Sequence, residues 1–528
     1  MPSPITQFRQ VRLSLTDLLG DDYMAAVCAA RACTSGDDPQ ALRAIANEKV
    51  DFYPRALHDR LLALLPRTGQ SVCPPLVGSA KGATTESFRA ASRTQMAPLA
   101  GFGCFRVTED GRLFLISKSE HYHAPLGHGF AGYRLAENAR RLGIPNATHN
   151  NTRGHITRLL EQELIRTANG LADDRRLADV LTSTQPGVLN RVLNLETGSL
   201  AAEAALKMVL SRFYKSQPDV PEPTYAGRTP VLLVVGDDDG ALQANYHGTT
   251  IITQAMRGMW PELLAAWQQH DALRIRAVRP NRFDDVERAF AEDDSGRCKI
   301  AGFFHEIVMM NYGGRLLGKD FLQRTYELCR RHDVATVVDE IQSVLWHPDL
   351  YMFREYGLEP DFVVLGKGCT GGEYAASRVL FGAAYDSLPQ FGALVTNGQE
   401  EIASLVYLIT MRWAQANADV TRAIGDYFQQ RLRDFADRRP ELITAVDGSR
   451  HLAGICFAAV EPAKAFAAAL NESGIDISVQ TYKTTCPPAA LIKPPLIAGY
   501  EVIDLLLDKM QAAIENVSPR PTKRPTDT

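Results

Sequence analysis

Two residues that can do chemistry follow neighbouring predicted strands. Residues 334–338 and 362–365 are short β-branched runs that predict buried strands; Asp339 follows the first directly, and Lys367 follows the second after one glycine. Ligands of an open parallel sheet bind beyond the carboxyl ends of its strands, so a carboxylate and an amine placed there are candidates for catalysis. Either residue alone is equally consistent with a helix cap or a solvated loop. Their pairing favours a catalytic role.

Two further segments have features that suit a flat, phosphorylated ligand. The chain turns through Gly198 and Ser199 into an alanine-rich predicted helix, whose first N–H groups and positive dipole end suit a phosphate. An ordinary serine N-cap fits the same pattern. Tyr246, followed by His247, comes after a predicted strand, where its ring could cover a heterocycle or be buried in the core.

A group of histidines and one arginine are weaker candidates. His121, His123 and His128 lie close together beside Glu120, but their spacing matches no common zinc pattern, so a pocket-lining or loop role is favoured over a metal site. Arg153, in a later polar loop, could bind a substrate carboxylate or be solvated.

Composition narrows the class of protein. The chain has 528 residues, of which 45% are hydrophobic, which is enough for two or three domains. Its net charge of -4 argues against nucleic acid as a partner. Nine cysteines occur without paired spacing, which suits free thiols in a reducing compartment. We find no secretory signal and no uncharged stretch long enough to span a bilayer, and therefore expect a cytoplasmic protein.

The candidate residues together match what pyridoxal 5'-phosphate requires. A lysine amine forms a Schiff base with the cofactor aldehyde, and a carboxylate beside the ring nitrogen keeps that nitrogen protonated, so the ring can act as an electron sink. A helix start that binds phosphate and an aromatic plate complete the set. Strands and helices alternate from residue 230 to 305, and a further helix leads back into the strand that ends at Asp339, which predicts an α/β fold.

The motifs resemble those of the class III (ornithine/omega-aminotransferase-like) family of pyridoxal-phosphate enzymes, from about residue 101 to 514. The family's SGTEANEAALK segment is similar to TGSLAAEAALK here, which implies that Gly198 and Ser199 bind the phosphate. The family's aromatic-His-Gly motif is similar to NYHGTT, which implies that Tyr246, with His247, covers the cofactor ring.

The resemblance extends to the acid and the lysine. The family motif DEVQTG is similar to DEIQS, which implies Asp339 at the ring nitrogen and Gln342 near the phenolic oxygen. The family motif LGKALGGG is similar to LGKGCTGG, which makes Lys367 the aldimine lysine. Glu306 stands where the family has the glutamate of its VEP motif, and Thr396 where a threonine reaches the phosphate of a neighbouring subunit. A homodimer with the site at the subunit interface is implied.

The family has fold type I, which implies a mostly parallel, seven-stranded central sheet with helices on both faces and a smaller α+β domain. We expect a helical and loop-rich extension over residues 1–100, part of the small domain over 101–185, a large cofactor-binding domain over 186–395, the rest of the small domain over 396–515, and a disordered tail over 516–528.

The activity implied is an aminotransferase that moves an amino group between an amine or amino acid and a keto acid or aldehyde acceptor through the Lys367 aldimine. A racemase or epimerase, an aminomutase or a decarboxylase on the same fold is the alternative, because one carbanion can be partitioned in several ways. A non-catalytic binding or regulatory homologue is a third interpretation.

Two departures from the family affect the substrate. After Gln342 the chain reads SVLWHPD, where the family usually has TGFGRTG. Leu491 stands where several members carry an arginine for the α-carboxylate, and leucine cannot provide bidentate carboxylate recognition. Either the donor lacks a carboxylate at that subsite, or another group, such as Lys493 or Arg153, binds it.

Overall fold

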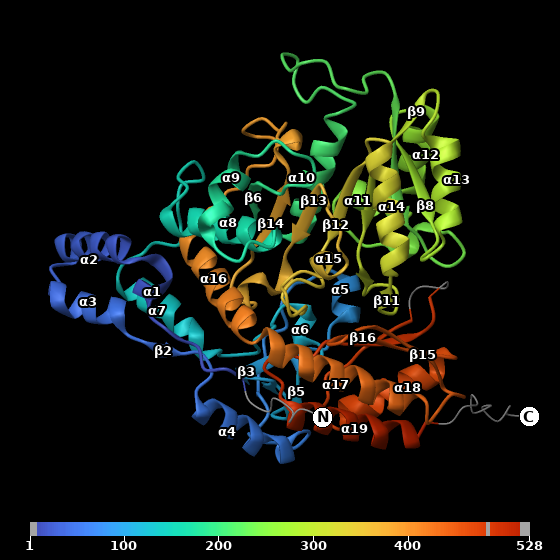
Figure 1. Ribbon diagram of the computed structural model, residues 1–528. Coiled ribbons are helices and arrows are strands. Elements are labelled where there is room, and N and C mark those ends of the chain that lie inside the picture. Colours follow the sequence, from blue (N-terminus) through green and yellow to red (C-terminus); the bar gives the residue numbers. More distant parts are fainter. Residues whose placement is uncertain (1–7, 482–485, 518–528) are drawn as a thin grey trace, which may run out of the picture.

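A seven-stranded sheet forms the centre of the protein. The computed structural model describes residues 8–481 and 486–517. The strands of the sheet are β6 (Arg191–Leu195), β7 (Thr229–Val235), β8 (Arg274–Val278), β9 (Cys298–His305), β12 (Ala335–Asp339), β13 (Phe362–Leu365) and β14 (Ser377–Phe381). Their order is β6-β14-β13-β12-β9-β7-β8, and β14 alone runs antiparallel to its neighbours in this sheet (Figure 1). The predicted α/β fold with a mostly parallel sheet is confirmed.

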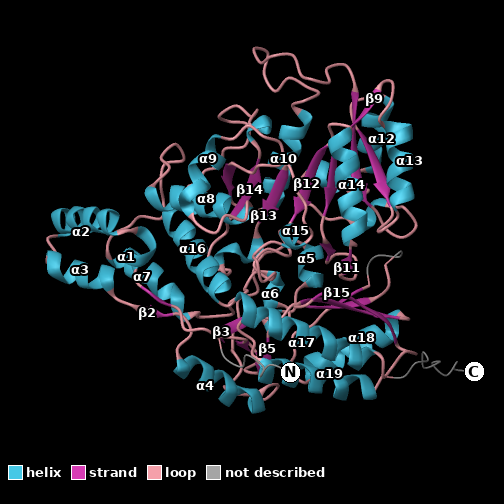
Figure 2. Cartoon of the chain, in the orientation of Figure 1, coloured by secondary structure: helices cyan, strands magenta, loops and turns pink. Residues whose placement is uncertain are grey.

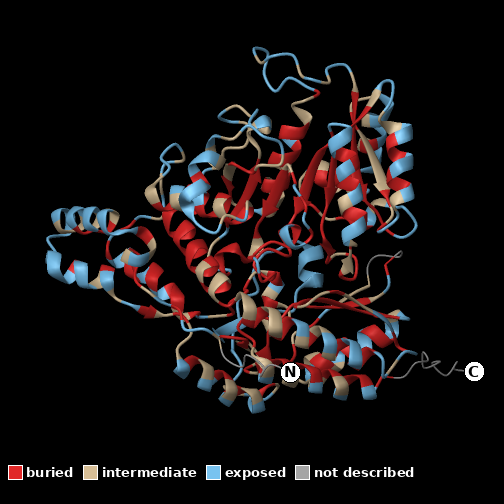
Figure 3. Ribbon diagram, viewed as in Figure 1, coloured by how far each residue is buried: buried red, intermediate tan, exposed pale blue. Residues whose placement is uncertain are grey.

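Helices cover both faces of this sheet (Figure 2). The helices of this part of the chain are α8 (His155–Ala168), α9 (Leu177–Thr182), α10 (Gly198–Leu210), α11 (Ile251–Met256), α12 (Pro261–Gln269), α13 (Phe283–Asp293), α14 (Lys319–Arg331), α15 (Met352–Glu355) and α16 (Glu401–Ala416). In β7, Leu232 and Val234 pack in the core that contains α10, whereas Val231 and Leu233 face the core that contains α13 and α14. Because both faces are covered, the strand is apolar throughout instead of alternating, and its residues are buried (Figure 3).

The carboxyl-terminal part of the chain forms a second, four-stranded sheet. It contains β15 (Ile443–Ser449), β16 (Leu452–Phe457), β17 (Val479–Gln480) and β18 (Ala489–Ile492), all antiparallel, and is accompanied by α17 (Ala418–Ala436), α18 (Val460–Glu472) and α19 (Tyr500–Glu515). An earlier three-stranded sheet contains β3 (Pro98–Phe102), β4 (Phe105–Thr108) and β5 (Leu113–Leu115). Backbone hydrogen bonds join Leu115 to Gly474 and Asp476, so the two regions, far apart in sequence, form one unit.

The N-terminal region contains five α-helices and two short strands among the described residues before β3. Its elements are β1 (Arg12–Leu13), α1 (Leu15–Leu19), α2 (Asp21–Ser35), α3 (Pro39–Asn47), β2 (Val50–Asp51), α4 (Arg55–Leu64) and α5 (Glu86–Ala91). Helices α1 and α3 pack against α7 (Arg134–Arg141), and the ring of Phe8 lies 5.4 Å from that of Trp413 in α16. No helix in the described ranges is long and apolar enough to cross a membrane. The disordered tail predicted from residue 516 falls mostly outside the described residues.

Candidate active site

The acid and the lysine meet in one cavity. Strands β12 and β13 are parallel neighbours, with Asp339 in register with Val364, so Asp339 and the residue after Gly366 emerge at the same edge of the sheet. Both Asp339 and Lys367 line a cavity of about 670 Å³ at this edge. Lys367 has a φ of 47°, a left-handed conformation that costs a non-glycine residue on the order of 1 kcal/mol and that concentrates at functional sites.

Lys367 is poised as a reactive amine. Burial lowers the pKa of Lys367 to about 8, although the nearby charges of Glu306 and Asp339 oppose the shift. A substantial fraction of the side chain is therefore neutral at slightly alkaline pH. A neutral amine is the form that attacks a carbonyl carbon and accepts a proton.

Asp339 is held by two donors. Its side chain is 4% exposed; one carboxylate oxygen lies 2.9 Å from Nδ1 of His247, and the other accepts a hydrogen bond from the Ile341 N–H at 3.0 Å. Because its neighbour is a carboxylate, we assign the proton of the imidazole to Nδ1, which then donates to Asp339. His247 is thus a buried support that fixes the direction of the acid.

The first turn of α10 lies against two other loops of the site. The Thr197 hydroxyl accepts from the Ser199 N–H and caps the helix, and the Ser199 hydroxyl accepts from the Thr249 N–H at 3.1 Å. A Cβ at Gly198 would come within 2.4 Å of the Ile341 side chain, and one at Gly248 within 2.8 Å of the Ser199 Cα. Only glycine permits this close approach, and Gly198 and Ser199 at the start of the helix line the cavity.

The remaining predicted cofactor residues line the same cavity, apart from Thr396. Tyr246 and His247 come from the loop before α11, Glu306 follows β9, and Gln342 follows β12. Glu306 is 3% exposed, and the buried Oε1 of Gln342 has no hydrogen-bond partner among the described residues. Thr396 is exposed in the loop before α16 and does not line the cavity of this chain.

The structure brings neither candidate substrate residue to the cavity. Arg153 forms an ion pair with Glu161 beside a different cavity. Lys493 is fully buried, donates to the carbonyl oxygens of Gln342 and Tyr122 at 2.6 and 3.3 Å, and stacks 3.6 Å over the ring of Trp346. Lys493 therefore connects two loops of the site by hydrogen bonds, and a substrate in the cavity cannot contact it.

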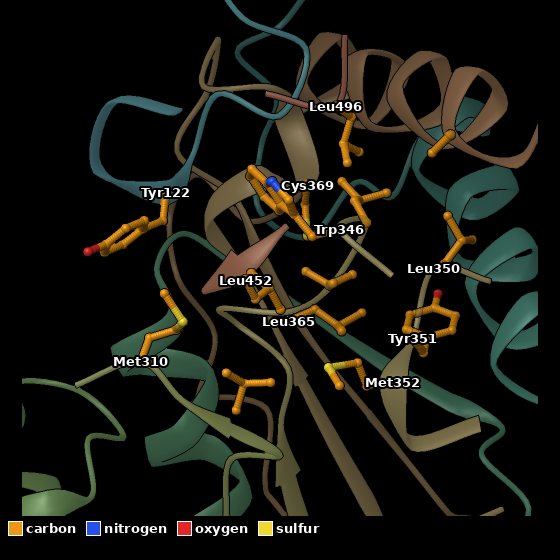
Figure 4. Close-up of a cluster of buried hydrophobic side chains, with 14 of the residues drawn as sticks. Tyr122, Met310, Trp346, Leu350, Tyr351, Met352, Leu365, Cys369, Leu452 and Leu496 are labelled. Carbon is orange, nitrogen blue, oxygen red and sulfur yellow. The ribbon is translucent and has the colours of Figure 1, made fainter. Parts of the chain in front are cut away.

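The unusual segment after Gln342 explains this burial. Val344, Leu345 and Trp346 are each at most 2% exposed, so the segment is part of the core instead of an open substrate loop. Figure 4 shows Trp346 in a cluster of apolar side chains, with Cys369 and Leu496 labelled next to it.

Several lining residues were not identified from the sequence, and two of them, Tyr122 and Arg257, bear on the substrate. The loop that contains Ser119, Glu120 and Tyr122 has all three in left-handed conformations, and Glu120 is anchored by an ion pair with Arg106. As a result the Tyr122 ring lies 5.2 Å from Nζ of Lys367. The second missed residue, Arg257, enters the cavity directly after α11.

The histidines of this region also have clear places. His121 and His123 line the cavity, as the pocket-lining interpretation expected, whereas His128 lies 2.7 Å from Glu120. Burial, followed by the charge of Lys367, lowers the pKa of His121 to about 4. Among the described residues, no group of three or more histidine, cysteine or acidic side chains is placed to hold a metal ion.

The buried position of Lys493 makes a prediction about stability. Burial, and then the charge of Lys367, lower the pKa of Lys493 well below its ordinary value of 10.5. The folded state then disfavours the charged form, a cost that is complete at low pH and is relieved as pH rises toward the unfolded pKa, at about 1.4 kcal/mol per pKa unit. Urea denaturation should show wild-type stability rising with pH relative to Lys493→Met. The exposed Lys81→Met is the control; parallel pH curves for wild type and Lys493→Met would contradict the expectation.

Comparisons with known proteins place this geometry among aminotransferases. Residues 162–514 match the family model "Aminotransferase class-III". The chain is 26% identical over 294 residues to the aminotransferase PigE of Serratia sp., covering 53% of this chain but 31% of that protein. It is 26% identical over 330 residues to the ornithine aminotransferase of an Exiguobacterium species, covering 60% and 74%. It is 25% identical to the L-lysine-epsilon aminotransferase of Streptomyces clavuligerus, covering 49% and 58%.

Solved structures share the fold. A transaminase from the marine bacterium Virgibacillus superposes with a TM-score of 0.64 at 17% identity, covering 83% of this chain and 96% of the other. The ornithine aminotransferase of Toxoplasma gondii, in a structure with partial occupancy of pyridoxal phosphate at its active site, gives 0.62 at 20% identity, covering 83% and 96%. At these identities the likeness concerns the fold, which is that of the fold type I enzymes.

Proposed function

The chain belongs to the class-III aminotransferase family, and we propose that it is a pyridoxal-phosphate-dependent aminotransferase acting on an amine or amino acid and a keto acid or aldehyde. The observation that carries the proposal is the convergence of Asp339, Lys367 and the first turn of α10 on one cavity. The matched regions span from 31% to 74% of the relatives named above, so this activity is inferred from the site and the family together.

The residues present fit the cofactor. The open helix start at Gly198 and Ser199 would hold the phosphate, and Tyr246 would lie over the ring. Asp339, fixed by His247, would sit at the ring nitrogen, and the amide NH2 group of Gln342, which lines the cavity, would donate to the phenolic oxygen. When bound, the cofactor supplies an electron-poor ring that stabilises negative charge on the carbon next to the transferred nitrogen.

The protein's own groups perform the proton movements. Lys367 would be the amine that attaches the cofactor, and its Nζ, when free, would accept the proton of the substrate carbon. A pKa of about 8 suits this role, because a base works best when its pKa lies near the operating pH. His247 and the Ile341 N–H hold both oxygens of Asp339, which would fix the direction of this carboxylate toward the ring nitrogen.

We further infer a cytoplasmic homodimer with the site at the subunit interface. All nine cysteines are free thiols, which supports a reducing compartment. Thr396 is exposed in the loop before α16, where it is accessible to a second copy. Light scattering should give twice the chain mass. A mixture of two inactive variants, Lys367→Ala and Thr396→Ala, would then recover part of the activity in mixed dimers.

A screen of amino donors and keto acceptors tests the activity. The purified protein with pyridoxal phosphate should show a visible absorbance band that shifts on addition of an amine, and net amino transfer by chromatography. Racemisation of a chiral amino acid without net transfer would favour the racemase alternative. The absence of both the band and any turnover would favour the non-catalytic homologue.

A further inference from the structure

Arg257 supplies the cavity with a positive charge that forms no ion pair with any acidic side chain of the described residues. It directly follows α11 and lines the cavity together with Tyr246 and Lys367. The residue as a whole is of intermediate burial. Proteins commonly bind carboxylate or phosphate anions with an arginine guanidinium that is not already paired with an acidic side chain.

The ring of Tyr246 orients this charge. The guanidinium carbon of Arg257 lies 5.0 Å from the centre of the Tyr246 ring. Stacking on an aromatic face uses the flat side of the guanidinium and leaves its N–H groups free at the edge. These N–H groups form the planar fork that matches the two oxygens of a carboxylate.

The other basic residues of this region are not placed or charged to bind a carboxylate in the cavity. Burial lowers the pKa of His121 to about 4 and that of His123 below its ordinary value, so both are neutral at pH 7. Lys367 is committed to the transferred nitrogen. Lys493 is closed off behind the cavity and Arg153 lies at another one.

Leu491, in the four-stranded sheet, offers the cavity no cation. Leu491 is 2% exposed and lies in β18, paired with β16. We infer that Arg257 binds a carboxylate of the substrate and thereby makes amino acids and keto acids, in preference to simple amines and aldehydes, the substrate class of this enzyme. This inference rests on the proposed aminotransferase activity.

Substitution of Arg257 should change specificity more than chemistry. In Arg257→Gln, kcat/KM for a keto acid acceptor such as pyruvate should fall on the order of 10- to 100-fold, as expected for lost charge-assisted hydrogen bonds, mainly through KM. With propanal, which lacks the carboxylate, the change should be less than about threefold on the same principle. Arg257→Lys should recover part of the loss, and the exposed Arg60→Gln of α4 should behave as wild type.

A binding measurement separates the substrate carboxylate from the cofactor phosphate. Titration calorimetry on cofactor-free protein uses glutarate as the carboxylate probe and inorganic phosphate as the phosphate probe. The inference expects Arg257→Gln to weaken glutarate and leave phosphate unchanged. Weakened phosphate binding, or equal losses with pyruvate and propanal, would overturn it. If wild-type protein transfers no amino group to either acceptor, the proposed function fails, and the glutarate titration still decides whether Arg257 binds a carboxylate.

Discussion

Lys367→Ala should abolish amino transfer while leaving the fold intact. Loss of general acid–base catalysis alone accounts for about 10²- to 10⁴-fold, and loss of the attaching amine adds to it, so the expected decrease in kcat is on the order of 10⁴-fold or more. Since burial of Lys367 is unfavourable for its charged form, the variant should unfold at no lower urea concentration than the wild type. Single-turnover kinetics with a saturating amino donor measure the decrease.

The pH dependence of cofactor attachment gives an independent check. With the pKa of Lys367 lowered to about 8, the reactive neutral amine increases as pH rises through that value. The rate at which cofactor-free protein captures pyridoxal phosphate, trapped with borohydride, should therefore rise from pH 6 to 9 with a midpoint near 8. Peptide mapping should locate the label on Lys367, and the exposed Lys319→Ala should retain it. A label that persists in Lys367→Ala at the wild-type rate is incompatible with the assignment.

The part of the cavity that contains Asp339 and Lys367 was predictable because its residues follow regular elements. Periodicity identifies β12 and β13 as buried strands, and the ends of neighbouring parallel strands must share one crevice, so Asp339 and Lys367 had to approach each other. The same holds for Gly198 and Ser199 at the start of α10. The fold determines where a side chain lies when its residue is at the end of a strand or the start of a helix.

The substrate end was not predictable for a related reason. Tyr122 reaches Lys367 through a loop with three left-handed non-glycine residues, a conformation that no local sequence pattern signals. Arg257 depends on where the short helix α11 ends. Lys493, which the sequence suggested as a carboxylate ligand, is enclosed because Trp346 packs into the core and provides an aromatic face for its ammonium group. Tertiary packing decided these three positions.

Asp339→Asn should be the second most damaging substitution. Asparagine has nearly the same shape and can still accept from the Ile341 N–H, but a neutral amide cannot hold a proton on the cofactor ring nitrogen. The expected decrease in kcat is on the order of 10²- to 10⁴-fold, the range for loss of a catalytic proton-holding group. Stopped-flow measurement of the half-reaction should show slowed proton removal, and a deuterated amino donor should give a larger isotope effect than with the wild type.

Asp361→Asn provides a control at the opposite end of the same strands. Its carboxylate accepts from the backbone and hydroxyl of Thr336 at 2.8 and 3.0 Å, far from the cavity that Asp339 lines. Burial raises the pKa of Asp361, so its amide should be tolerated with little change in kcat. Asp339→Glu, which keeps the charge, should recover part of the activity lost in the asparagine variant. If Asp339→Asn and Asp361→Asn lowered kcat equally, the effect would be a general consequence of disturbing the strands. The proposed role of Asp339 at the cofactor ring nitrogen would then be wrong.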